Sequence, residues 1–131
     1  LLVDDCYNAN ASSMFAAIDT IRERVERTGA RFVALLGEMR ELGAAAEAGH
    51  DEVGREARES GAALILAVGP LASRITFQLL GSPITHVHVT TAEDAAALAR
   101  EWIVQGDLVL VKGSRGIGTD LVVERLKAEF A

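Results

Sequence analysis

The chain has 131 residues, half of them hydrophobic, and a formal net charge of −6. A chain of this length suits one globular domain, because folding at this size hides roughly two thirds of the unfolded surface. The acidic balance argues against nucleic-acid binding by bulk electrostatics, although single basic residues and helix ends can still hold small anions. The chain begins without methionine and directly inside an apolar strand, so we expect a single domain, residues 1–131, of a longer protein.

Cys6 is the single cysteine of the sequence, which excludes an intramolecular disulfide and a multi-cysteine metal site. This composition suits a reducing cytosol, and we expect a cytoplasmic location. No apolar run reaches the ~20 residues that a membrane helix needs, so neither a membrane nor nucleic acid is an expected partner. Cys6 is interpreted as a small turn residue rather than a nucleophile, because no histidine lies near it in the sequence.

A polar turn between an apolar strand and a helix is the first feature with chemical content. The strand is predicted over residues 1–3, and the helix from apolar side chains at helical spacing, which are Met14, Ile18, Ile21 and Val25. Open α/β sheets place their ligands in turns of this kind. Asp5 can accept two ribose hydroxyls, and Tyr7 offers a flat face to a purine.

The start of this first helix allows two interpretations. If it begins after Asn10 or Ser12, its free N–H groups can receive an anion. Alternatively, Asn10 and Ser12 only cap the helix, and Asp4 and Asp5 are acids of an ordinary turn, since most Asp/Asn turns bind nothing. The chemistry of the residues leaves both interpretations open.

The rest of the chain alternates between apolar strands and amphipathic helices. Strands are predicted at residues 31–36, 63–68, 85–89 and 108–111. The helices between them are predicted at about residues 44–60, from Pro70 to a stop at Gly81, and after Thr91 as the N-cap. A last helix is lined by Val122, Val123, Leu126 and Phe130. Short links and right-handed crossovers predict an α/β fold: a doubly wound, mostly parallel Rossmann-like sheet with helices on both faces.

The loops that follow the first, second, third and fifth strands should emerge together at one edge of such a sheet. These loops are also the richest in Gly, Asp, Asn, Lys, Arg and Ser. Ligands of open α/β sheets bind at the carboxyl ends of the strands. We therefore predict the binding face at this edge.

The glycine-rich loop at residues 112–118 resembles a phosphate cradle only superficially. Lys112-Gly113-Ser114 has the wrong residue order for a P-loop, and Gly116-Ile117-Gly118 lacks the third glycine of a dinucleotide fingerprint. What remains is a cationic pair, Lys112 and Arg115, with Ser114 between them at a helix start. That arrangement suits a carboxylate or a phosphate, and equally describes a solvated basic turn.

The histidines and the second-strand loop give weaker signals. His86 and His88 share one face of a strand, but no carboxylate or thiol stands beside them at ligand spacing, so no metal site is predicted. His50 lies on the apolar face of its helix and is interpreted as a buried, hydrogen-bonded histidine. The charges between residues 38 and 41 are interpreted as an ordinary charged loop.

Several of these segments, taken in order, resemble the C-terminal domain of the Mur ligases. The segments are residues 4–10 with Ser13-Met14, residues 36–43, His50, Val68-Gly69 and residues 111–115. The resemblance covers essentially the whole chain and points to the members that join D-alanyl-D-alanine to UDP-N-acetylmuramoyl-tripeptide. The chain departs from the family at Ala11, where proline is usual, at Glu38, where aspartate is usual, and at Thr119-Asp120, where Met-Glu is usual.

The resemblance implies the last of three domains of an ATP-dependent ligase. In the family the first domain binds the UDP-sugar and the central domain carries the P-loop and the Mg²⁺ ligands. The last domain closes over the nucleotide and brings the amino acid or dipeptide. The peptide carboxylate forms an acyl-phosphate with ATP, and the dipeptide amine attacks it. This domain alone is then expected to be inactive, with no catalytic residue and with ATP and Mg²⁺ bound mainly by the central domain.

The resemblance also implies roles for individual residues. Nucleotide contacts fall on Asp5, Tyr7, Asn8 and Asn10, and contacts to the peptide or dipeptide carboxylates fall on Lys112, Ser114 and Arg115. An alternative remains open, namely a stand-alone, non-catalytic α/β module that binds a nucleotide. An upstream P-loop domain in the same reading frame would favour the ligase.

Overall fold

The computed structural model describes residues 2–5, 10–40 and 42–130. Its five strands form one sheet in the order β1-β5-β2-β3-β4, with every neighbouring pair parallel. The strands are β1 (Leu2–Asp5), β2 (Phe32–Gly37), β3 (Leu64–Val68), β4 (Thr85–Val89) and β5 (Leu108–Lys112). The predicted parallel sheet is thus confirmed, and β5 occupies its interior between β1 and β2.

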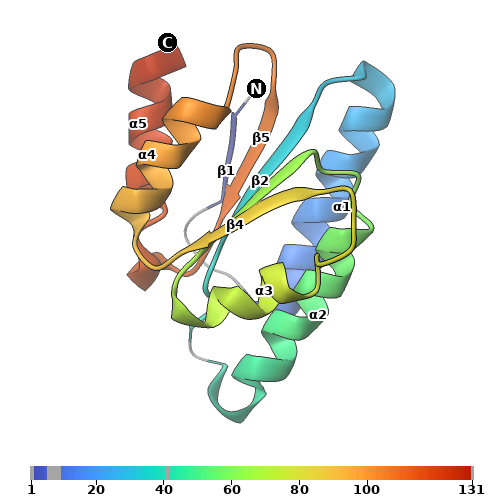
Figure 1. Cartoon of the computed structure of the whole chain (residues 1–131), viewed down its shortest axis with the longest axis vertical. Helices are drawn as coiled ribbons and strands as arrows, with labels where there is room; N and C mark the ends of the chain where they lie inside the picture. The colour runs from blue at the N-terminus through green and yellow to red at the C-terminus, as the bar shows by residue number, and fades with distance from the viewer. Residues whose placement is uncertain (1, 6–9, 41, 131) are drawn as a thin grey trace.

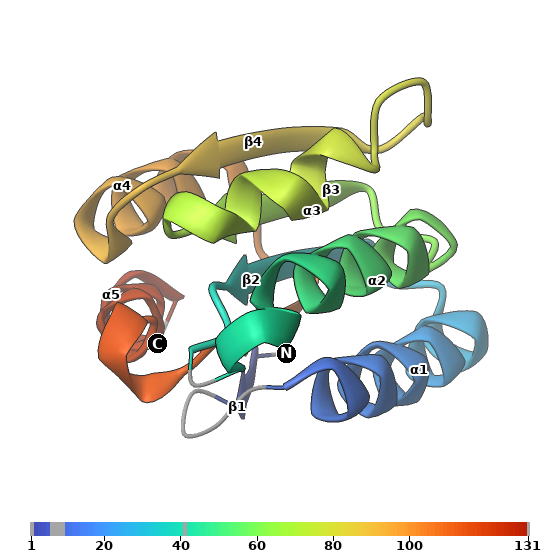
Figure 2. The same cartoon turned by 90° about the horizontal axis from the view of Figure 1, so that it is seen from below.

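Helices cover both faces of the sheet (Figures 1 and 2). The helices are α1 (Ala11–Thr28), α2 (Ala46–Arg58), α3 (Ser73–Phe77), α4 (Ala92–Trp102) and α5 (Asp120–Phe130), and single 3₁₀ turns precede α2, α3 and α5 at Gly43–Ala45, Pro70–Ala72 and Arg115–Ile117. One core joins α1, α2 and α3 to alternate side chains of the strands, and a second core joins α4 and α5 to the others. The doubly wound architecture is therefore confirmed.

The central strands are apolar, except for Lys112 at the end of β5, because helices bury them from both sides. Every residue of β2, β3 and β5 is buried, whereas β4, at the sheet edge, is mostly half-buried. At the other edge β1 is longer than the predicted strand. Asp4 and Asp5 continue its pairing with β5 as partners of Val111 and Lys112, so they end a strand instead of forming the predicted turn.

Two helix starts follow the sequence closely. The Asn10 side chain accepts a hydrogen bond from the Ser13 N–H at 2.9 Å, and the Ser13 hydroxyl accepts one from the Asn10 N–H at 3.0 Å. This reciprocal capping box fixes Asn10 as the N-cap of α1. In the same way the Thr91 hydroxyl accepts from the Asp94 N–H at 3.2 Å and caps α4, as predicted.

The helix predicted from Pro70 to Gly81 is the main secondary-structure error. The structure has a 3₁₀ turn at its start and only five α-helical residues, which end at Phe77. Beyond that point the backbone bonds reach back three residues, as in Leu79 N–H to Thr76 O at 2.9 Å. Leu79 is still fully buried, so the apolar spacing was correct although the backbone tightens into 3₁₀ geometry.

Among the described residues, no helix is long and apolar enough to cross a membrane.

Candidate functional site

The carboxyl ends of four neighbouring strands form the predicted edge. Lys112 at the end of β5 is in register with Asp5 of β1 on one side and with Leu36 of β2 on the other. Gly37 in turn is in register with Val68 of β3. The carboxyl ends of β1, β5, β2 and β3 therefore lie side by side, as the geometric prediction requires.

The exits of β2 and β5 approach each other too closely for side chains. A Cβ atom on Gly113 would lie 2.9 Å from the Gly37 Cα, and one on Gly37 would lie 3.0 Å from the Gly113 Cα. A Cβ contact of 2.9 Å is essentially never seen in proteins, and one of 3.0 Å is tighter than nine in ten real contacts. Because neither glycine has a side chain, the segment after β2 can pack directly on residues 112–118, which begin at the last residue of β5 and are called the β5 loop below.

Hydrogen bonds then join these two loops. The Ser114 N–H donates to the Glu38 carbonyl at 3.2 Å, and the Arg40 N–H donates to the Ser114 hydroxyl at 2.7 Å. The Glu38 N–H donates to the Val68 carbonyl at 2.7 Å, which extends the connection to β3. Residues 38–40 thus bridge the ends of β3 and β5.

Lys112 and Ser114 belong to this bridged region and are not part of a solvated turn. Their exposed fractions are 2% for Lys112 and 7% for Ser114. Burying an ammonium group costs free energy unless polar groups surround it. The burial of Lys112 therefore indicates a polar environment at this edge. For Arg115 the structure places only the backbone, at the start of the 3₁₀ turn before α5.

Glu38 and Arg40 are two residues of this edge whose packing the sequence analysis did not predict. Glu38 is 8% exposed, and its side chain packs so closely on Gly69 that a Cβ there would lie 2.7 Å from the Glu38 Oε2. The exposed Arg40 reaches over Gly116, where a Cβ would lie 2.9 Å from the Arg40 Nη1. Interpreting these residues as an ordinary charged loop was wrong, because the loop packs against the β5 exit. Their position after a buried parallel strand was the available signal.

The residues expected to contact a nucleotide are only partly covered by the structure. Tyr7 and Asn8, with Cys6, lie outside the described residues, and Asp5 is described only through its backbone pairing in β1. Asn10 is described fully, and its side-chain oxygen is engaged in the α1 cap. The carboxyl end of β1 thus lies beside the carboxyl end of β5.

The three histidines all bind backbone groups. His50 is fully buried, with its Nε2 2.9 Å from the Met39 N–H nitrogen and its Nδ1 2.6 Å from the Ala46 carbonyl oxygen, which confirms the predicted buried, hydrogen-bonded histidine. His86 donates to the Ile84 carbonyl at 2.9 Å, and His88 donates to the Gly69 carbonyl at 2.7 Å. Within the described ranges no three His, Cys, Asp or Glu side chains gather as a metal-binding group.

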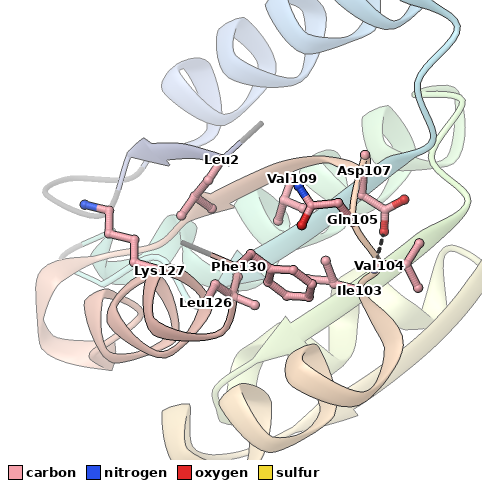
Figure 3. A pocket seen from close by; sticks show the side chains of 10 residues that line it. Leu2, Ile103, Val104, Gln105, Asp107, Val109, Leu126, Lys127 and Phe130 are labelled. Atoms are coloured by element: carbon pink, nitrogen blue, oxygen red, sulfur yellow. Dashed lines mark hydrogen bonds between the residues drawn. The ribbon is translucent and has the colours of Figure 1, made fainter.

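A pocket of about 440 Å³ opens at the opposite, amino-terminal edge of the sheet (Figure 3). Its wall is mainly apolar and includes Leu2, Val109 and Phe130.

The Asp107 carboxylate beside this pocket accepts hydrogen bonds from the Arg31 Nε and Nη2 at 2.9 and 2.7 Å and from the Val104 N–H at 2.9 Å. Burial alone would raise the pKa of Asp107, but these bonds hold it below its usual value.

A parallel, doubly wound sheet with helices on both faces defines an α/β domain of the Rossmann-like fold. The chain belongs to the Mur ligase family, since the family model described as "Mur ligase, glutamate ligase domain" matches residues 1–115. It is 35% identical over 128 residues to the UDP-N-acetylmuramoyl-tripeptide–D-alanyl-D-alanine ligase of Escherichia coli. That alignment covers 97% of this chain and 27% of the relative, so the chain spans about a quarter of its relative's length.

Solved structures give the same relationship. A crystal structure of MurF from Acinetobacter baumannii superimposes with a TM-score of 0.82 at 26% identity, over 97% of this chain and 28% of that one. The crystal structure of the MurF ligase from Thermotoga maritima in complex with ADP superimposes with a TM-score of 0.73 at 25% identity, over 98% and 28%. The resemblance first noted in separate short segments therefore extends to the whole fold.

Proposed function

We propose that this chain is the C-terminal domain of an ATP-dependent ligase that joins D-alanyl-D-alanine to UDP-N-acetylmuramoyl-tripeptide. The observation that carries the proposal is the 35% identity, over almost the whole chain, to a ligase named for this reaction. The shared carboxyl edge supports it, because the ends of β1 and β5 lie side by side there. A ligase of this kind must hold a nucleotide beside an acidic substrate.

The β5 loop is the acceptor side of the proposed site. The peptide substrate and the dipeptide both carry carboxylates, and Lys112, Ser114 and Arg115 supply a point charge, a hydroxyl and a planar guanidinium for them. Arg40 adds a second guanidinium over Gly116. In an edge that excludes water, such groups bind and orient a carboxylate more strongly than they would in solvent.

Residues 5–10, called the β1 loop below, form the nucleotide side of the proposed site. Asp5, Tyr7, Asn8 and Asn10 are proposed to contact the ribose, the base and the anionic part of ATP, and the ADP complex of the Thermotoga relative supports a nucleotide in this family. ATP supplies the phosphoryl group that activates the peptide carboxylate. The described donors of the β5 loop suit anions, and Mg²⁺ is proposed to bind mainly to the central domain. The location is proposed to be cytoplasmic.

A comparison of the 131-residue chain with the full-length protein tests this assignment. Two cores cover both sheet faces, so the chain alone should unfold cooperatively, yet it should neither hydrolyse ATP nor form D-alanyl peptide. The full-length protein should form the D-alanyl-D-alanine product only when the tripeptide substrate, the dipeptide and ATP are all present. Nucleotide binding by the chain, with no ligation by the full-length protein, would instead identify a non-catalytic nucleotide-binding module.

A further inference from the structure

His50 is held by hydrogen bonds at both ring nitrogens. It lies on α2 with no exposed surface, and Met39 N–H and the Ala46 carbonyl are its two partners, at 2.9 and 2.6 Å. A carbonyl oxygen only accepts, so Nδ1 must carry a proton and donate it to Ala46. An amide N–H only donates, so Nε2 must offer its lone pair to Met39. One neutral tautomer alone satisfies both bonds.

The other proton states of His50 break this arrangement. A doubly protonated imidazole would direct its Nε2–H at the Met39 N–H, placing two donors against each other. The neutral Nε2–H tautomer would do the same and would also leave the Ala46 carbonyl facing a lone pair. A buried donor left without its acceptor is costly, so the structure requires a neutral His50 with the proton on Nδ1.

Met39 connects this histidine to the candidate site. It is the middle residue of the bridge at residues 38–40, and its own side chain is buried. On either side of it, the Glu38 carbonyl accepts from the Ser114 N–H, and the Arg40 N–H donates to the Ser114 hydroxyl. His50 therefore fixes the centre of a short segment whose two ends hold Ser114.

We propose that His50 is a positioning residue of the ligase site. Acting through the Met39 N–H, its neutral imidazole fixes the bridge at residues 38–40 against the β5 loop. That loop and Arg40 then present their cations to the substrate carboxylates in one geometry. His50 itself touches no substrate. The identity of the carboxylates rests on the proposed function, whereas the mechanical connection from α2 to Ser114 does not.

Two substitutions of His50 separate the two bonds. In His50→Gln, the amide oxygen reaches the place of Nε2 and can accept from the Met39 N–H. In His50→Asn, the shorter amide reaches only the place of Nδ1, so it can donate to the Ala46 carbonyl but leaves the Met39 N–H without a partner. Val53→Ala, a buried residue of the same helix that is not hydrogen-bonded to the bridge through its side chain, controls for lost stability.

The kinetic test uses the full-length ligase. His50→Asn should raise the KM for the dipeptide or the peptide substrate about ten-fold or more, while the KM for ATP changes much less. His50→Gln should remain within about three-fold of the wild type, and Val53→Ala should lower the melting temperature without this selective rise. Equal KM effects from the Gln and Asn variants, or a Val53→Ala effect that matches His50→Asn, would overturn the proposal.

Nuclear magnetic resonance of the 131-residue chain tests the same connection without ligase activity. The imidazole ¹⁵N shifts should show a protonated Nδ1 and a bare Nε2. The amide signals of Met39 and Ser114 should move together in His50→Asn and stay near their wild-type positions in His50→Gln. A protonated Nε2, or a Ser114 amide unaffected in His50→Asn, would contradict the positioning role. If the spectra agree but the full-length protein does not ligate the dipeptide, the proposed substrate is wrong and the connection stands.

Discussion

Asp5 and Lys112 are register partners in neighbouring parallel strands, although they stand near opposite ends of the chain. Adjacent strands lie about 4.8 Å apart, so the carboxyl ends of β1 and β5 are next to each other. In the proposed ligase, the β1 loop contacts the nucleotide and the β5 loop contacts the carboxylates of the peptide substrate and the dipeptide. The pairing of β1 with β5 would then place the two reacting partners on the same side of the domain.

Replacing Arg115 by alanine in the full-length ligase should selectively weaken the binding of the peptide substrate or the dipeptide. A guanidinium matches a carboxylate with two parallel hydrogen bonds, and loss of a charge-assisted bond costs about 1.5–3 kcal/mol. The KM for the peptide or the dipeptide should rise roughly ten- to a hundred-fold, much more than the KM for ATP. Arg125→Ala, an exposed arginine of α5, is the matched control. A selective change in the ATP KM would assign the loop to the nucleotide instead.

Replacing Asp5 by asparagine should impair the use of ATP with little effect on folding. The substitution keeps the size of the side chain but removes the charge that would strengthen hydrogen bonds from ribose hydroxyls. The ATP KM or kcat/KM should change by roughly ten- to a hundred-fold, which corresponds to about 1.5–3 kcal/mol. Steady-state kinetics and thermal unfolding decide the question. Unchanged kinetics would return Asp5 to a role in strand β1, and a large fall in Tm would make it a structural acid.

Gly113→Ala should damage both stability and the site. Its Cβ would lie 2.9 Å from the Gly37 Cα, so the exits of β2 and β5 would have to separate, at a cost of about 1–3 kcal/mol. Gly29→Ala is a useful comparison, because this C-cap of α1 has a φ of 71° and open space around it. That change should cost about 1–2 kcal/mol through backbone strain alone. Urea unfolding should show both losses, whereas only Gly113→Ala should raise the substrate KM.

Asp107→Asn should remove an acid-sensitive part of the stability. The pKa of Asp107 is lowered in the folded protein, so its contribution is fully present above the ordinary aspartate pKa of about 3.9. That contribution is lost as the pH falls through the lower folded pKa. At pH 7 the substitution should lower the free energy of unfolding by about 2–3 kcal/mol, because the amide keeps only one accepting oxygen and turns its NH2 group toward an N–H donor of Arg31 or Val104.

Urea unfolding of the Asp107→Asn variant and the wild type between pH 7 and pH 2 measures this effect. The difference between the two proteins should shrink steadily below about pH 4. Asp94→Asn, at an exposed position in the first turn of α4, should show a much smaller difference across the range. A constant gap between Asp107→Asn and the wild type down to pH 2 would mean that packing, not the charge, carries the role of Asp107.

Local sequence patterns were sufficient for most of the sheet and for the helix caps. The fourth strand was predicted with the bounds that the structure has, Thr85–Val89, and Thr91 was identified as the cap of α4. These features depend on alternation, side-chain chemistry and turn residues close in the sequence. The third helix was predicted too long because apolar spacing of three to four residues does not distinguish an α-helix from a 3₁₀ segment.

The parts of the site that were missed depend on contacts between distant segments. The burial of Glu38 and Lys112 follows from the position of β5 beside β2, and that strand order leaves no local trace in the sequence. The reach of Arg40 over Gly116 follows from the close approach at Gly37 and Gly113. The pocket at the amino-terminal edge combines β1, β5, α5 and the loop before β5, so no single stretch could indicate it.

The place of β5 inside the sheet also sets the order in which the domain can be completed during its synthesis. A ribosome releases β1 first, but β1 pairs only with β5, the last strand to emerge. Strands β2, β3 and β4 are neighbours in sequence and can pair early, whereas β1 must wait with its apolar side chains unpaired. A premature stop anywhere before Leu108 would therefore remove the β5 side of the candidate site and leave β1, with Asp4 and Asp5 at its end, without its partner strand.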